Sequence, residues 1–160
     1  TTASTGDPEI SVLHGVKTDL PLVGDWNGDG EATIGVFRPD RLQGFFHLRN
    51  LNTPGNADLV FGFGVEGDVP LAGDWDGDGT VTVGLYRPRQ GTFLLRNSNA
   101  GGDPDVVIEY GTPGDLPAVG DWDGDGRTTI GLYRPQDGAF HLRNHNTPGP
   151  FEVFVPNKLS

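Results

Sequence analysis

Short apolar runs separated by turn residues recur along the whole chain. They are rich in Val, Leu, Ile, Phe and Tyr, and Gly, Pro, Asn or Asp bounds them. Such runs predict β-strands joined by tight turns, and no stretch shows the 3.6-residue period of a helix. The predicted strands that follow residue 16 are 22–24, 35–39, 45–50, 57–64, 71–73, 84–88, 92–97, 105–111, 118–120, 131–135, 139–144 and 151–155.

The predicted strands fall into three units of four, which repeat every 47 to 49 residues (25 to 74, then 74 to 121). This period is typical of β-propeller blades, because one four-stranded sheet cannot bury its faces without neighbours. We therefore predict an all-β chain of three four-stranded, propeller-type blades. The threefold repeat alone also fits a closed β-trefoil or β-prism-like domain. The expected organisation is a flexible lead-in (1–8) and one repeat array (9–160), with a lone strand (9–15), repeats at about 16–64, 65–111 and 112–155, and a short tail (156–160).

One heptapeptide recurs in all three units. It reads Gly-Asp-Trp-Asp-Gly-Asp-Gly at 73–79 and 120–126, and Gly-Asp-Trp-Asn-Gly-Asp-Gly at 24–30. Counted from the first Asp, oxygen-bearing side chains occupy positions 1, 3 and 5, and Gly occupies position 6. Alternating oxygen donors followed by a turn-forming Gly form the first half of a calcium loop. Position 12 is Val36, Leu85 or Leu132 rather than the Glu of an EF-hand, so we predict a calcium loop between two strands.

The predicted ligands are the side chains at positions 1, 3 and 5, the carbonyl at position 7 and the hydroxyl at position 9, with water completing the shell. An alternative interpretation is that Asp and Asn only form Asx-turns at a tight corner. Carboxylates packed this closely repel one another unless a cation lies between them. Three copies of the pattern favour the metal, and we predict three Ca²⁺ sites. The predicted ligands are Asp25, Asn27, Asp29, Glu31, Thr33, Asp74, Asp76, Asp78, Thr80, Thr82, Asp121, Asp123, Asp125, Arg127 and Thr129.

The composition narrows the functional classes. The formal net charge is −11, and eight of the 22 acidic residues lie in the heptapeptides, so we expect no nucleic-acid partner. The chain has no Cys, which excludes disulfides and thiol chemistry. No apolar stretch approaches transmembrane length, so we expect no membrane insertion. The chain starts like a processed segment, and calcium is abundant outside cells, so we expect a secreted protein.

Two motifs of the chain carry a resemblance to a known family. The first is an apolar residue followed by Gly-Asp-Trp-Asp-Gly-Asp-Gly, and the second is the Gly-Leu-Tyr-Arg-Pro that comes after it. Together they resemble the FG-GAP/VCBS family of integrin-α-like repeats, which occur in secreted bacterial proteins. The resemblance covers Ile10 to about Phe154. It implies β-propeller blades that bind Ca²⁺ in the loop between their first two strands, through the nine Asp and Asn side chains at positions 1, 3 and 5. The family loop commonly has Asp at position 9. The Thr found there in this chain implies modest calcium affinity.

Several other residues recur once per unit. Trp26, Trp75 and Trp122, at position 2 of the loops, are candidate sugar-stacking residues, although a large side chain between metal ligands more often packs between blades. We expect the recurrent Arg residues to pair with Asp or to bond strand-end carbonyls, and the recurrent Asn residues to turn the chain. These residues are Arg38, Arg87, Arg134, Arg49, Arg96, Arg143, Asn52, Asn99 and Asn146.

The sequence contains no Gly-x-Ser-x-Gly or His-Glu-x-x-His motif, and its clustered carboxylates are mostly assigned to calcium, so we predict no enzyme. We expect an extracellular calcium-binding module with a binding or structural role toward a protein or carbohydrate ligand. The alternatives are a calcium-dependent multivalent lectin and an accessory domain of, or a divergent, secreted hydrolase. Three blades are too few to close a ring, so the missing blades would come from a second copy or from a longer parent protein, and we predict that the isolated chain is a homodimer.

Overall fold

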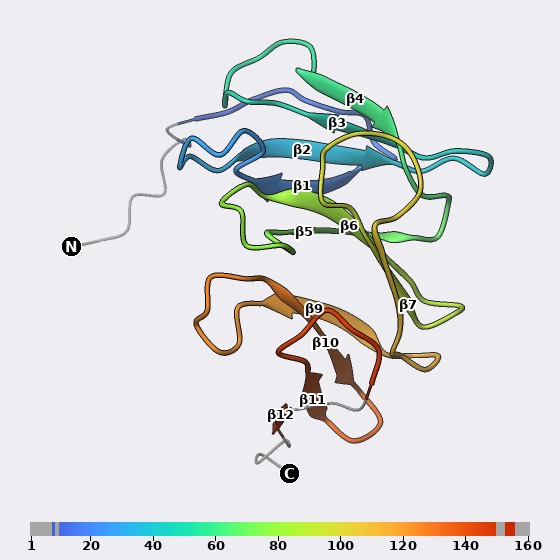
Figure 1. Ribbon diagram of the computed structural model, residues 1–160. Coiled ribbons are helices and arrows are strands. Elements are labelled where there is room, and N and C mark those ends of the chain that lie inside the picture. Colours follow the sequence, from blue (N-terminus) through green and yellow to red (C-terminus); the bar gives the residue numbers. More distant parts are fainter. Residues whose placement is uncertain (1–7, 9, 150–152, 156–160) are drawn as a thin grey trace, which may run out of the picture.

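The computed structural model describes residues 8, 10–149 and 153–155 (Figure 1). Throughout this part of the chain every regular element is a β-strand, so the all-β prediction is confirmed. The strands are β1 (Leu20–Gly24), β2 (Thr33–Arg38), β3 (Phe45–Leu48), β4 (Leu59–Gly62), β5 (Val69–Gly73), β6 (Thr82–Arg87), β7 (Thr92–Leu95), β8 (Val106–Glu109), β9 (Leu116–Gly120), β10 (Thr129–Arg134), β11 (Ala139–Leu142) and β12 (Val153–Val155).

The strands form three antiparallel sheets, each a meander of four consecutive strands. We call β1–β4 sheet 1, β5–β8 sheet 2 and β9–β12 sheet 3. In Figure 1 the sheets follow one another in a stack, and the first strands are neighbours, with β1 beside β5 and β5 beside β9. The predicted division into three four-strand units is therefore confirmed.

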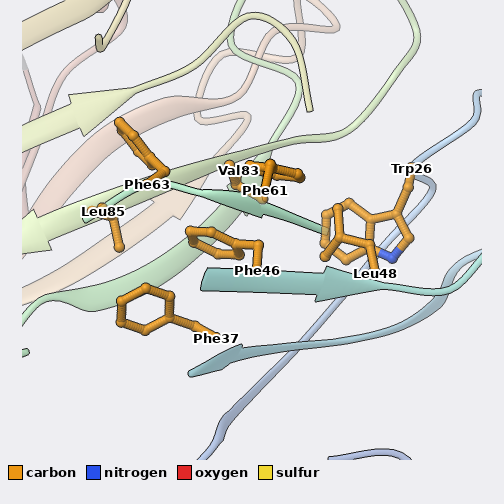
Figure 2. Close-up of a cluster of buried hydrophobic side chains, with 8 residues drawn as sticks. All are labelled: Trp26, Phe37, Phe46, Leu48, Phe61, Phe63, Val83 and Leu85. Atoms are coloured by element: carbon orange, nitrogen blue, oxygen red, sulfur yellow. The ribbon is translucent and has the colours of Figure 1, made fainter. Parts of the chain in front are cut away.

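The apolar core lies between successive sheets. Because side chains alternate along a strand, β6 of the middle sheet sends Val83 and Leu85 toward sheet 1 and Tyr86 toward sheet 3. Figure 2 shows the first cluster, in which Trp26 and aromatic rings of sheet 1 pack against Val83 and Leu85 of sheet 2. The rings of Phe46 and Phe61 stack with centroids 5.5 Å apart. Ile130 and Leu132 of sheet 3 complete the equivalent cluster around Trp75. Sheet 2 therefore packs against a sheet on both faces, whereas sheets 1 and 3 each pack against one.

Hydrogen bonds join the heptapeptide loops of the first two repeats to the repeat that follows. The Val81 N–H donates to the Asp25 carbonyl over 2.9 Å, and the Thr128 N–H donates to the Asp74 carbonyl over 2.8 Å. The Asn99 side-chain amide donates to the carbonyls of Trp26 and Val81. In the next repeat, the equivalent Asn146 amide bonds the carbonyls of Trp75 and Thr128. These asparagines bridge repeats, a role beyond the predicted turn.

A bidentate ion pair ties the turn before each first strand to the end of the second strand. Arg134 donates from Nε and Nη2 to the buried Asp115 carboxylate over 2.9 and 2.8 Å. The Thr112 N–H caps the same carboxylate. The other repeats have the equivalent pairs Arg38–Asp19 and Arg87–Asp68. The predicted Arg–Asp pairing is confirmed.

The second set of arginines holds the loop after each third strand. Buried Arg49 donates to the carbonyls of Thr53 and Asn56, and Arg96 donates to those of Ala100 and Asp103. Arg143 donates to the Thr147 carbonyl in the same way. A planar guanidinium has five donors, so one side chain satisfies several carbonyls of a loop that has no strand partners. The predicted carbonyl-bonding role is confirmed.

The structure corrects the predicted strand at 9–15. Residues 10–14 have no strand pairing, and Glu9 lies outside the described residues, as do the tail at 156–160 and the lead-in apart from Pro8. The equivalent segments β4 and β8 pair with the third strand of their own sheets. The third strand of sheet 3, β11, pairs with β10 on one side and with β12 on the other. The segment at 10–14 therefore has no third strand with a free edge to pair with.

Candidate metal centres in three loops

Each heptapeptide forms the loop between the first two strands of its sheet, and the three loops lie along one side of the stack (Figure 1). We call residues 25–32 loop 1, residues 74–81 loop 2 and residues 121–128 loop 3. In loop 2, Gly77 and Gly79 have φ values of +75° and +91°, and the glycines at positions 4 and 6 of the other loops match them. Only glycine adopts this backbone readily, so the two glycines let the loop close around its first side chain.

The Asp at position 1 is the centre of each loop. In loop 2, Asp74 Oδ1 accepts hydrogen bonds from the N–H groups of Gly77 and Asp78, and Oδ2 accepts one from Gly79, over 2.8 to 3.0 Å. Asp121 makes the equivalent three bonds in loop 3. Each carboxylate oxygen has two lone pairs, so these bonds position the side chain and leave acceptor capacity for a cation.

The side chains at positions 3 and 5 turn toward the first one. Asp76 Oδ1 accepts from the Asp78 N–H, and Asp78 Oδ1 accepts from the Thr80 N–H over 2.8 Å. One oxygen from each of Asp74, Asp76 and Asp78 lies within 4.8 Å of the others, and the triplet of Asp121, Asp123 and Asp125 has the same geometry. These two triplets could hold a metal ion, and their hard oxygen donors suit a hard divalent cation.

Loop 1 differs at position 3. The Asn27 amide donates to Asp29 Oδ2 over 3.0 Å, whereas the carboxylates at this position in the other loops cannot donate. Asp25 accepts from the N–H groups of Asp29 and Gly30, two of the three bonds of position 1, and Asp29 accepts from the Glu31 N–H as in the other loops. Loop 1 therefore has the same shape with one negative charge fewer.

Hydrogen bonds lower the pKa of some loop carboxyl groups, and burial raises the pKa of another. The N–H of Glu31, and then the Asn27 amide, lower the pKa of Asp29. The N–H of Gly126 is the main cause of the lowered pKa of Asp121. In loop 2, desolvation raises the pKa of Asp76, and Asp78 and Asp74 add to the increase through their negative charge. A bound cation would reverse this last effect, because an opposite charge favours the ionised carboxyl.

The structure places the predicted position-9 ligands at the start of the second strands. Thr33, Thr82 and Thr129 are buried at the first position of β2, β6 and β10. Their hydroxyls donate to the carbonyls of Gly24, Gly73 and Gly120 on the paired strands, and the Thr82 hydroxyl also lies 2.7 Å from the Arg96 carbonyl. A hydroxyl that donates keeps its oxygen lone pairs, so these threonines stay predicted ligands. The carbonyls at position 7, of Glu31, Thr80 and Arg127, stay predicted ligands.

The structure also corrects the sugar-stacking prediction for two of the three tryptophans. Trp26 and Trp75 are buried between sheets, and their Nε1 groups donate to the carbonyls of Ile34 and Val83. A ring buried in this way has no face for a sugar. Trp122 makes the equivalent bond to Ile130 but is half-buried, because the described chain has no sheet beyond sheet 3.

A surface hollow lies near the Arg87–Asp68 ion pair and is also lined by Arg41, Glu66 and Arg89. Asp68 is its buried acid, and both of its carboxylate oxygens accept hydrogen bonds from Arg87 over 2.8 Å. This carboxylate is held in an ion pair, so the hollow offers no evident pair of acids for general acid–base catalysis.

No protein-family model, curated protein or solved structure matches the chain. Among the described residues, no helix is long and apolar enough to cross a membrane.

Proposed function

We propose that this chain is a calcium-stabilised β-repeat module that acts outside the cell in a non-catalytic binding or structural role. The observation that carries the proposal is the pair of Asp triplets, held at equivalent places in loops 2 and 3. All donors are hard oxygens and several are carboxylates, and carbonyl oxygens and water can extend the shell beyond six ligands, which favours Ca²⁺ over Mg²⁺ or a softer metal.

The proposal extends to three calcium sites. Loop 1 supplies Asp25, Asn27 and Asp29 in the backbone arrangement of the other loops, and an Asn carbonyl oxygen is an ordinary calcium ligand. The position-7 carbonyls and water would complete each shell. With one carboxylate fewer, loop 1 is the weakest site of the three.

We further propose that the sheets are arranged as propeller blades. Two observations support this arrangement over a β-trefoil or a β-prism. The first strands of successive sheets lie beside one another, and each sheet packs its apolar face against the next. The resemblance of the loop and strand motifs to FG-GAP/VCBS repeats supports the same arrangement.

Among binding roles, the burial of Trp26 and Trp75 favours a protein ligand or a structural role over a lectin. A lectin with three equivalent pockets needs three equivalent stacking residues at the surface, and the tryptophans do not provide them. The ion-paired acid of the surface hollow likewise argues against a hydrolase.

The experiment specific to this assignment is Asn27→Asp. The substitution gives loop 1 the carboxylate found in loops 2 and 3, so the weakest calcium site should gain about tenfold or more in affinity. Calorimetric titration with calcium measures the change, and Gln90→Glu is the matched control because it adds the same charge at an exposed position in the turn between β6 and β7, outside the three loops. If Asn27→Asp does not raise the calcium affinity of the weakest site, or if the control raises it equally, the assignment of Asn27 as a ligand is contradicted.

A further inference from the structure

The two ends of the sheet stack carry the two halves of the contact that joins sheets inside the chain. That contact, which we call the junction, occurs twice, between sheets 1 and 2 and between sheets 2 and 3. In each junction one sheet contributes aromatic residues and loop carbonyls. The next sheet contributes β-branched apolar residues, a backbone N–H and an Asn side chain.

The aromatic half is uncovered on sheet 3. Phe140 is 41% exposed, whereas the equivalent Phe46 and Phe93 are fully buried in junctions. Tyr133 and Trp122 are half-buried, whereas their equivalents in sheets 1 and 2 are buried. The rings of Tyr133 and Phe140 pack with centroids 5.0 Å apart, as Tyr86 and Phe93 do at 4.8 Å in sheet 2. We call Trp122, Tyr133 and Phe140 the trailing face.

The complementary half is partly uncovered on sheet 1, where Val36 is buried beside Gly15 but other apolar side chains of this half are not. Ile34 is half-buried, whereas the equivalent Val83 and Ile130 have no exposed surface. Val23 pairs with Ile34 across the strands and is 64% exposed, and Phe45 is also exposed. We call Val23, Ile34 and Phe45 the leading face.

Polar groups at the two ends match as well. Asn52 donates to the Ala32 carbonyl over 3.1 Å, as Asn99 donates to Val81 and Asn146 to Thr128. The latter two asparagines also bond a Trp carbonyl of the preceding repeat. At the other end of the stack, the carbonyls of Asp121 and Trp122 correspond to those that accept hydrogen bonds at the internal junctions.

We propose that the trailing face of one chain binds the leading face of a second copy, head to tail, through a third instance of the junction. The Asp121 carbonyl would accept from the Ala32 N–H of the second copy, and the Trp122 carbonyl would accept from its Asn52 amide. Two chains joined at both ends contain six sheets, within the four to eight blades typical of closed propellers. This ring count rests on the blade arrangement proposed above, whereas the head-to-tail contact does not.

One residue makes the proposed contact sensitive to charge. At the internal junctions, the position-7 residue of the following repeat lies against the preceding loop: Thr80 beside Gly28, and Arg127 beside Gly77. Arg127 also donates to the Asp76 carbonyl over 3.2 Å. At the head-to-tail contact this place belongs to Glu31, which would face the acidic triplet of loop 3. Like charges oppose association, so the contact is weaker without a cation in loop 3.

The test uses sedimentation velocity on the whole chain in calcium. We expect the wild type to form a particle of twice the 17.1 kDa chain mass. Val23→Asp, on the leading face, and Phe140→Asp, on the trailing face, should each remain monomeric at the same concentration. Val107→Asp is the matched control, because Val107 is 51% exposed on sheet 2 and belongs to neither face, and it should dimerise. Thermal melts of all variants check that each one is folded.

The decisive sample is a mixture of Val23→Asp and Phe140→Asp. Each variant keeps the face that the other has lost, so the mixture should form a 1:1 dimer through one intact junction. A wild type that stays monomeric at about 100 μM would overturn the proposal, because that concentration exceeds the Kd of most specific interfaces. Dimers of Val23→Asp alone would overturn it too, since they would show contact between two trailing faces.

Glu31→Arg tests the register of the head-to-tail contact, that is, whether residue 31 of one chain faces loop 3 of the other. It reproduces Arg127 of the internal junction, so in chelator the Kd of the dimer should fall about tenfold or more, with a smaller fall in calcium. No change in chelator would overturn the proposed register. A gain that is equal with and without calcium would support the register and count against a cation in loop 3, so the two proposals can fail separately.

Discussion

Removal of calcium should lower the melting temperature of the chain by about 20 °C. A ligand at a hundredfold excess over its Kd stabilises the native state by about 2.7 kcal/mol per site, so three sites contribute about 8 kcal/mol. In a domain of this size, 1 kcal/mol corresponds to about 2 to 4 °C. The packed carboxylates of loops 2 and 3 add mutual repulsion that only a cation relieves. Scanning calorimetry in chelator and in millimolar calcium measures the difference.

Magnesium is the control for this experiment. It requires a tighter, nearly octahedral shell and gives up its water reluctantly, so we expect it to restore only a small part of the lost stability. A melting temperature that does not change on chelation would show that the loops hold their shape through hydrogen bonds alone.

Breaking one Arg–Asp pair should have the second-largest effect. Arg134→Met leaves the Asp115 carboxylate buried with only the N–H and hydroxyl of Thr112 as donors. A buried charge deprived of its partner costs about 3 kcal/mol, and urea unfolding in saturating calcium measures the loss. Arg41→Met is the control, because Arg41 is 91% exposed and lies 3.8 Å from Glu66. It should change the free energy of unfolding by less than about 0.5 kcal/mol.

The effect of Arg134→Met should depend on pH. The hydrogen bond from Arg134 lowers the pKa of Asp115 below its ordinary value. The ion pair therefore contributes its full stability above the unfolded pKa, near about 3.9, and loses it as the pH falls through the lower folded pKa. The difference between wild type and Arg134→Met should be constant from pH 7 to 5 and shrink below about pH 4. A difference that stayed constant down to pH 2 would contradict a charged pair.

The strands and loops were predictable because their determinants are local. Apolar runs bounded by Gly and Pro locate β2, β6 and β10, and the fixed spacing of Asp74, Asp76 and Asp78 locates the acidic triplet. The pairing of recurrent Arg with recurrent Asp was predictable because buried charges need partners.

The features that sequence reasoning missed depend on contacts distant in the chain. Thr82 occupies a predicted ligand position and is also the first residue of β6, where its hydroxyl lies 2.7 Å from the Arg96 carbonyl and 3.4 Å from the Gly73 carbonyl. Trp75 and Trp122 have identical local sequences, and only the presence of a following sheet makes the first one more buried. The bridging role of Asn99 likewise requires the preceding repeat beside it, although its recurrence in every repeat was a usable signal.

We expect each of the three loops to bind one calcium ion. Calorimetric titration of the metal-free wild type with calcium tests it most directly, because the stoichiometry is read without reference to stability or assembly. We expect three ions per chain, two bound with similar affinity in loops 2 and 3 and one bound more weakly in loop 1. A titration that shows no bound calcium at millimolar concentration would contradict it.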